Sequence, residues 1–155
     1  MARVLELSRL DASLNLFTAG GSARTLDAGD AGKVITLNVA AGTTITLPAA
    51  EGTGNMYSFV TTVLATSNQH KVQVANATDV MSGSLNVVDN ADGTTTSFGC
   101  VAASDTITLN RTTTGSVKVG GDRFHVQDVA AGYWAVWGVT TGTGGEATPF
   151  SAAVS

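Results

Sequence analysis

The feature that most constrains this chain is a repeated alternation of apolar and polar residues in short runs. Between residues 33 and 39, Ile35, Leu37 and Val39 alternate with polar neighbours, and residues 43–47 continue the pattern after a turn that contains a glycine. A period of two places successive side chains on opposite faces of a β-strand, whereas a helix needs a period of 3.6. The two runs therefore predict a β-hairpin.

Similar runs continue to about residue 140. Residues 55–64 are partly apolar on both faces, which indicates a central strand. Residues 122–129 and 133–139 flank a glycine turn and predict a hairpin in which Trp134 and Trp137 lie on opposite faces, so that only one of them fills the core. Turn signals recur about every 8–12 residues, as in sandwiches and barrels. We predict an all-β fold, a small antiparallel β-sandwich or barrel-like domain.

The two ends of the chain differ from this pattern. Residues 1–24 combine apolar residues with Arg and Asp and end in a Gly-Gly-Ser joint, which predicts an extended N-terminal arm before a β domain at 25–140; an ordinary first strand is the alternative. Residues 141–155 are rich in Gly and Thr and predict a flexible C-terminal tail, or one that docks on a partner. The arm's candidate contact residues for a partner protein or a neighbouring subunit are Val4, Leu5, Leu7, Leu10, Leu14 and Phe17.

Charge is scarce. Charged residues make up 13% of the chain, about half the share of roughly 25% in ordinary soluble domains. A surface of Thr, Ser, Asn and Gly repels neighbouring copies weakly, which suits a protein packed in an assembly. The net charge of −4 and the scattered lysines predict no nucleic-acid partner. No apolar run approaches the ~20 residues that span a bilayer, and the start does not resemble a signal peptide, so we expect no membrane association and synthesis in the cytoplasm.

No set of residues predicts catalysis. The chain has two histidines, His70 and His125, and one cysteine, Cys100, far apart in sequence and without a metal-binding spacing. His125 points away from its apolar neighbours and is interpreted as a surface or interface residue. Residues 89–93 faintly resemble a calcium loop but lack its spacing and closing Glu, so a turn is the better interpretation. We predict a protein that is not an enzyme and has no metal or cofactor.

Three segments resemble a family of phage virion proteins, which includes head decoration (cement) proteins and fibre-associated β domains. They are residues 26–33 (LDAGDAGK) before an alternating strand, residues 44–50 (TITLPAA) before the aromatic strand 57–60, and residues 121–126 (GDRFHV) before the tryptophan strand. The resemblance spans about residues 26–138 and rests on the order of these segments more than on any one. It implies a β-rich, often trimeric domain on the outside of a capsid.

Two functional hypotheses follow from this resemblance. The first is a capsid decoration protein on the virion exterior, a homotrimer that binds the major capsid protein and bridges its subunits. The second is a carbohydrate- or receptor-binding β module of a tail fibre or spike. Trp137 is a candidate contact residue in both, as the tryptophan left outside the core.

Overall fold

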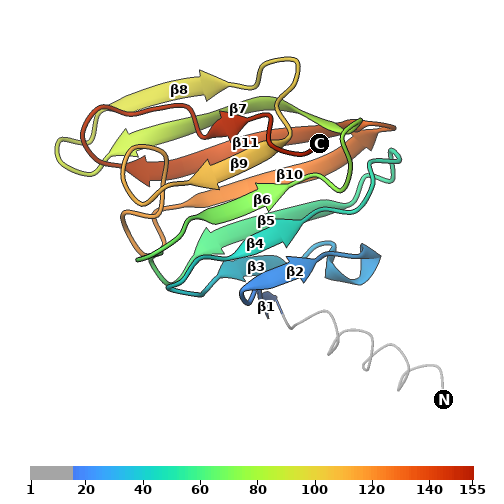
Figure 1. The fold of residues 1–155 in the computed structure, drawn as a ribbon, viewed down its shortest axis with the longest axis horizontal. Coiled ribbons are helices and arrows are strands. Elements are labelled where there is room, and N and C mark those ends of the chain that lie inside the picture. Colours follow the sequence, from blue (N-terminus) through green and yellow to red (C-terminus); the bar gives the residue numbers. More distant parts are fainter. Residues whose placement is uncertain (1–15) are drawn as a thin grey trace, which may run out of the picture.

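The computed structural model describes residues 16–155, which form two β-sheets packed face to face (Figure 1). One sheet has seven strands in the order β1-β3-β5-β10-β11-β7-β8, and the other has five in the order β12-β9-β6-β4-β2. Apart from the three-residue 3₁₀ turn η1 (Ala28–Asp30), these residues contain no helix. The predicted all-β sandwich is therefore confirmed, but both sheets mix parallel and antiparallel pairs and are not purely antiparallel as predicted. The strands are β1 Phe17–Ala19, β2 Ala23–Thr25, β3 Val34–Leu37, β4 Thr44–Thr46, β5 Met56–Thr61, β6 His70–Gln73, β7 Val80–Asp89, β8 Thr95–Gly99, β9 Thr106–Leu109, β10 Arg123–Ala130, β11 Tyr133–Gly142 and β12 Phe150–Ser151.

The first six strands wind as a flattened coil of parallel turns (blue to green in Figure 1). β1, β3 and β5 lie parallel in the seven-stranded sheet, and β2, β4 and β6 lie parallel in the five-stranded sheet. Each connection therefore crosses between sheets, and the predicted hairpin over residues 33–47 is wrong. Both strands exist there, but alternation specifies the buried face of a strand and not the strand with which it pairs.

The antiparallel pairings lie in the second half of the chain. β10 and β11 form the predicted hairpin, and β7 and β8 form another around the Asp92-Gly93 turn. β5 lies between β3 and β10, which confirms it as a central strand. Parallel pairing of β7 with β11 places the β7–β8 hairpin at the far edge of the sheet.

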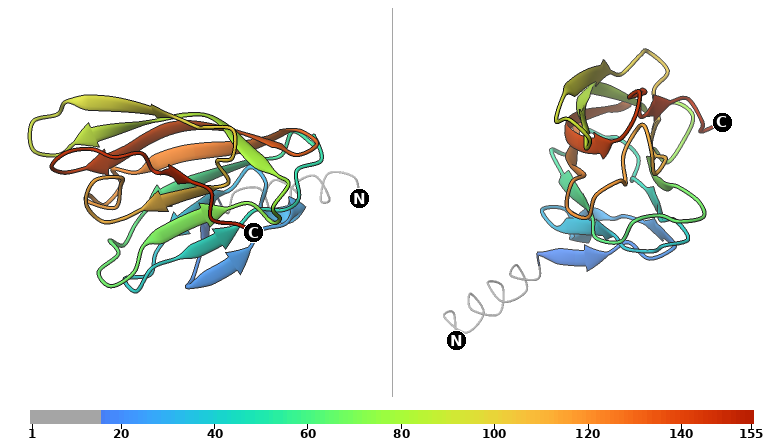
Figure 2. Two further views of the ribbon diagram at one scale, coloured as in Figure 1. Left: turned by 45° about the horizontal axis from the view of Figure 1, so that its top comes forward. Right: turned by 90° about the vertical axis from the view of Figure 1, so that its left-hand side faces the viewer.

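The core lies between the two sheets, which appear as two layers in Figure 2. Its largest side chains are aromatic. The rings of Phe59 and Phe124 stack with centroids 5.1 Å apart, and those of Tyr57 and Trp134 pack at 5.9 Å. Ring pairs of this kind stabilise a core by more than their buried area alone. Trp134 is thus the core tryptophan of the pair that the sequence placed on opposite faces.

The first turn of the coil closes the core with polar residues. Arg24 occupies in β2 the register position that Ile45 occupies in β4 and Val72 in β6. Its guanidinium lies 2.6 Å from the carboxylate of Asp30, which is almost fully buried. An ion pair therefore stands where the inner turns have aliphatic packing.

Both ends of the chain differ from the sequence expectation. Residues 17–25 hold β1 and β2, so the β domain begins well before residue 25; the rest of the predicted arm, with Val4, Leu5, Leu7, Leu10 and Leu14, lies outside the described residues. At the other end, β12 pairs with β9 and Phe150 is 7% exposed. The carboxylate of Asp105 accepts hydrogen bonds from the Ala153 and Val154 N–H groups at 2.8 and 3.1 Å. The C-terminal segment is therefore packed on the domain rather than free.

Candidate functional site

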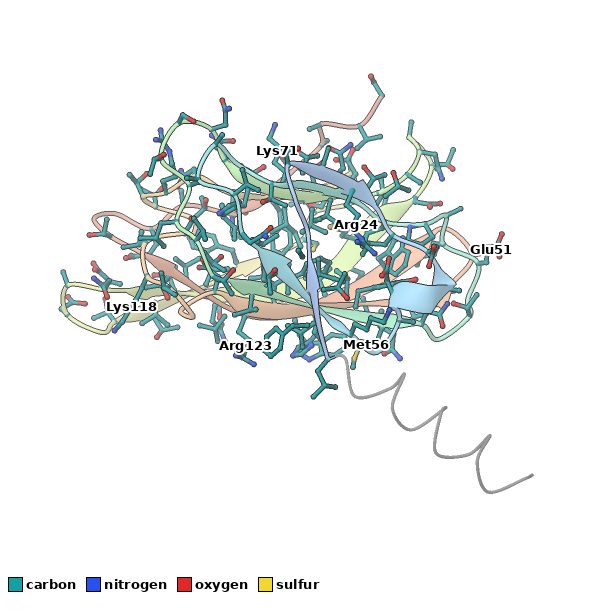
Figure 3. The ribbon with its side chains drawn as sticks, turned by 90° about the horizontal axis from the view of Figure 1, so that it is seen from below. Arg24, Glu51, Met56, Lys71, Lys118 and Arg123 are labelled. Atoms are coloured by element: carbon teal, nitrogen blue, oxygen red, sulfur yellow. The ribbon has the colours of Figure 1, made fainter. Side chains whose placement is uncertain are left out.

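The outer face of the seven-stranded sheet carries a row of side chains that the strand register places side by side. The neighbours of these residues in each strand, such as Ile35, Phe59 and Phe124, fill the core, so the row itself points away from it. In Figure 3, Met56 and Arg123 lie on this side of the sandwich, and Lys71 lies on the opposite side. We call these side chains the outer row: Phe17, Val34, Ser58, His125, Trp137 and Ser84.

Aromatic and apolar groups are exposed along this face. Phe17 is 62% exposed and Trp137 is 41% exposed, and the neighbouring Val139 is exposed as well. Large exposed apolar side chains on one sheet face are typical of interaction surfaces. The structure therefore places two predicted contact residues, Phe17 and Trp137, on one face. Their contact role stays a prediction.

A histidine holds the exposed tryptophan in place. The rings of His125 and Trp137 stack with centroids 5.3 Å apart, and the Ser58 hydroxyl lies 2.7 Å from Nδ1 of His125. Burial lowers the pKa of His125, and the nearby Arg123 lowers it further, so the ring is neutral at pH 7. A neutral, hydrogen-bonded ring presents Trp137 in a fixed orientation.

A serine hydroxyl beside a histidine ring, as in Ser58 and His125, is also the arrangement of nucleophile and base in some hydrolases. In such enzymes the base is oriented by a third group, commonly a carboxylate. No carboxylate of residues 16–155 hydrogen-bonds this imidazole. We therefore interpret the pair as a support for Trp137. Ser58 could not be predicted from the sequence, because the pairing of β5 with β10 joins distant segments of the chain.

Several aspartate side chains are buried, and their carboxylates accept hydrogen bonds from backbone N–H groups. For example, Asp122 accepts hydrogen bonds from the Ser116 and Thr141 N–H groups at 2.8 and 2.9 Å. The exterior is therefore even poorer in charge than the composition suggests. The buried aspartates are Asp30, Asp79, Asp105, Asp122 and Asp128.

The structure also bears on metal binding, on the turn at residues 89–93 and on membrane-spanning helices. Within the described part of the chain, no three His, Cys, Asp or Glu side chains are placed to share a metal ion. The carboxylates of Asp89 and Asp92 accept hydrogen bonds from the N–H groups of Ala91 and Thr94, as in the predicted turn. Over the same residues, no helix has the length and hydropathy to cross a bilayer.

The buried side chain of His70 in β6 links the loop before β4 to the loop after β5, and this predicts that the stability of the domain depends on pH. Its Nδ1 accepts a hydrogen bond from the Thr43 N–H at 3.1 Å, and its Nε2 lies 2.8 Å from the Val63 carbonyl, to which it donates. Burial lowers the pKa of His70, and the bond to Val63 only partly opposes this. The fold therefore favours the neutral ring.

We expect the free energy of unfolding to fall as the pH drops below about 6.5, the ordinary histidine value, because the unfolded chain then binds more protons than the native state. Urea unfolding at pH 7.5 and pH 5.5 measures this loss. The loss should shrink in His70→Gln, which has no titrating ring, and persist in part through His125. An unchanged loss in His70→Gln would show that other groups cause it.

Comparison of the chain with protein-family models, with curated proteins and with solved structures finds no match. The function is therefore argued from the fold and from the outer row.

Proposed function

We propose that this chain is a non-enzymatic structural protein of a phage virion, a capsid decoration protein that binds the outside of the head and stabilises the shell. The main support is the outer row, which exposes Phe17 and Trp137 on an open sheet face of a domain with little surface charge. The order of sequence segments that resembles decoration proteins supports the same assignment.

The proposed mechanism is mechanical. The outer row docks on the major capsid protein, and each Å² of apolar surface removed from water contributes about 25 cal/mol. Association as a homotrimer, which the resemblance implies, lets several copies bind together. Multivalent binding raises the strength of attachment well above that of one contact. Bridged capsid subunits then separate less readily.

The position of strand β1 is consistent with this mechanism. β1 is the edge strand of the seven-stranded sheet, and both Leu16 and Phe17 are exposed there. Residues 1–15, which contain the other proposed attachment residues, connect to the domain at this edge. The arm and the outer row can therefore contribute to one contact area on the capsid.

Replacing Trp137 with alanine is expected to weaken capsid binding at least tenfold, because a central aromatic residue commonly contributes 2 kcal/mol or more to an interface. Co-sedimentation of the purified protein with undecorated capsids measures this. Val101→Ala is the matched control, since Val101 is more exposed than Trp137 but lies outside the outer row. A chain lacking residues 1–15 should also bind less. If both changed proteins bind at the wild-type level, the proposed docking face is wrong.

The second candidate is a carbohydrate- or receptor-binding module of a tail fibre or spike. The observation that favours it is the exposed, fixed indole of Trp137, on which a sugar ring could stack. Electron microscopy of particles with labelled protein separates the two: label on the head shell supports decoration, and label on the tail supports the second candidate.

A further inference from the structure

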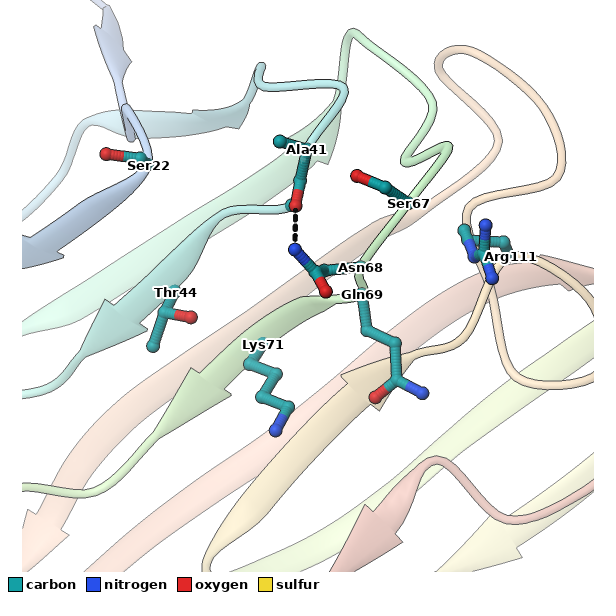
Figure 4. Close-up of a pocket in the computed structure, with 9 residues that line it drawn as sticks. Ser22, Ala41, Thr44, Ser67, Asn68, Gln69, Lys71 and Arg111 are labelled. Carbon is teal, nitrogen blue, oxygen red and sulfur yellow. Dashed lines mark hydrogen bonds between the residues drawn. The ribbon is translucent and has the colours of Figure 1, made fainter.

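A polar hollow of about 550 Å³, drawn in Figure 4, lies on the side of the sandwich opposite the outer row, where Figure 3 labels Lys71. Its floor includes Thr44 of β4 and Lys71 of β6, which point outward because their neighbours Ile45 and Val72 are buried. Loops at one end of the five-stranded sheet form its walls. The lining residues are Ser22, Ala41, Gly42, Thr44, Ser67, Asn68, Gln69, Lys71 and Arg111.

Hydrogen bonds between loops hold the walls of the hollow in place. The Asn68 side-chain amide donates to the Ala41 carbonyl at 2.9 Å, and the Thr66 N–H donates to the Ala40 carbonyl at 2.7 Å. Gly42 has a φ of 103°, and a Cβ there would lie 2.6 Å from the Gln69 carbonyl oxygen. The loops thus approach as closely as glycine allows, and the hollow is formed before any ligand binds.

The hollow is locally cationic although the chain is acidic overall. Among residues 16–155, Lys71 and Arg111 line it and no carboxylate does. The ion pairs of the described residues involve Arg24 and Lys33, so the charges of Lys71 and Arg111 are not neutralised by a partner. Two cations without a counter-ion, in a chain of net charge −4, favour an anionic ligand.

The backbone at Arg111 is held in an uncommon conformation. Its φ is 75°, in the left-handed region that favours glycine. The Arg111 N–H donates to the Gly115 carbonyl at 2.9 Å, and its guanidinium donates to the Thr66 carbonyl. Residues held in such conformations are concentrated at ligand sites. Here the conformation places a cation at the rim.

The rest of the lining determines the kind of anion. Hydroxyl and amide groups from Ser22, Thr44, Ser67, Asn68 and Gln69 offer both donors and acceptors, and no lining residue is aromatic. The volume lies in the range of small-ligand sites. We propose that the hollow binds an acidic saccharide of one or two rings, with its carboxylate near Lys71 and its hydroxyls on Arg111 and on the amides and hydroxyls of the walls.

This proposal does not depend on the docking role of the outer row. Because the two lie on opposite faces of the sandwich, a protein attached through the outer row would present the hollow to solvent (Figure 3). A saccharide on another surface could then reach it.

Nuclear magnetic resonance titration of the full chain tests the proposal. The probes are galacturonic, glucuronic and N-acetylneuraminic acids, with galactose and glucose as neutral sugars. We expect at least one acid to shift the backbone amides of residues 41–44, 67–71 and 110–112, and the neutral parent of a binding uronate to bind at least tenfold more weakly. Lys71→Ala should weaken binding about tenfold, the usual loss of one charge-assisted hydrogen bond, and Lys71→Arg should restore most of it.

The control variant is Lys118→Ala, which removes an exposed cation outside the hollow and should leave affinity unchanged. Thermal unfolding of Lys71→Ala checks that the fold is retained. The proposal is overturned if no acid binds at millimolar concentration, if neutral sugars bind as well as the acids, or if inorganic sulfate binds as tightly as the best acid, since the site would then select charge alone.

Discussion

Replacing Asp128 with alanine is expected to lower the free energy of unfolding by about 3 kcal/mol, one of the two largest effects of a single change outside the aromatic core. The Asp128 side chain is 2% exposed, and its carboxylate accepts hydrogen bonds from the N–H groups of Glu51, Gly52 and Thr53 at 2.6–3.1 Å and from the Thr53 hydroxyl at 2.7 Å. Alanine leaves these donors without an acceptor and releases the loop from β10.

Urea unfolding at pH 7 measures this loss. Burial by itself would raise the pKa of Asp128, but the bonds from Thr53, Gly52 and Glu51 outweigh it, and the pKa is lowered. The stabilisation is therefore present above the unfolded value of about 3.9 and is lost as the pH falls through the folded pKa. Glu51→Ala, an exposed change in the same loop, should alter stability by no more than about 0.5 kcal/mol. Equal effects of the two changes would contradict the assigned role.

Replacing Gly83 with alanine is expected to destabilise the domain by at least about 3 kcal/mol or to prevent folding. Gly83 pairs with Val136 across β7 and β11, and its φ is 128°. A Cβ at this position would lie 2.0 Å from the Val136 carbonyl oxygen, a backbone atom that can move only if the two strands separate.

Thermal and urea unfolding of Gly83→Ala measure the effect. Ser84→Ala is the matched control, because Ser84 is the next residue in β7 but is exposed on the outer row. We expect the control to stay within about 0.5 kcal/mol of the wild type. A Gly83→Ala protein as stable as the control would mean that β7 and β11 do not approach this closely.

The sequence predicted the strands and their faces well because both depend on neighbouring residues. Alternation located β3 and β4, and the odd spacing of Trp134 and Trp137 separated a core tryptophan from a surface one. Strand partners depend on contacts between distant segments, so the parallel coil was missed. The packed C-terminal segment was missed for the same reason, since Asp105 binds residues almost fifty positions away.

In the candidate sites too, features that depend on neighbouring residues could be predicted, and features that depend on distant residues could not. Phe17 and Trp137 could be chosen from the sequence as an apolar arm residue and a surface aromatic. Their shared face, and the support of Trp137 by His125, follow only from the register of the sheet. The hollow was not predicted at all, because Lys71 and Arg111 are 40 positions apart and the sequence shows them as scattered cations.

The ion pair of Arg24 and Asp30 in the first turn of the coil has a consequence for assembly. A parallel coil that ends in bare strand edges can template further turns from other chains, which leads to filaments. An inward-facing charge makes such growth unfavourable, since an added apolar turn would bury the pair away from water. The coil can thus end at its first turn, and growth by addition of other chains at this edge is disfavoured while the sheet face remains available.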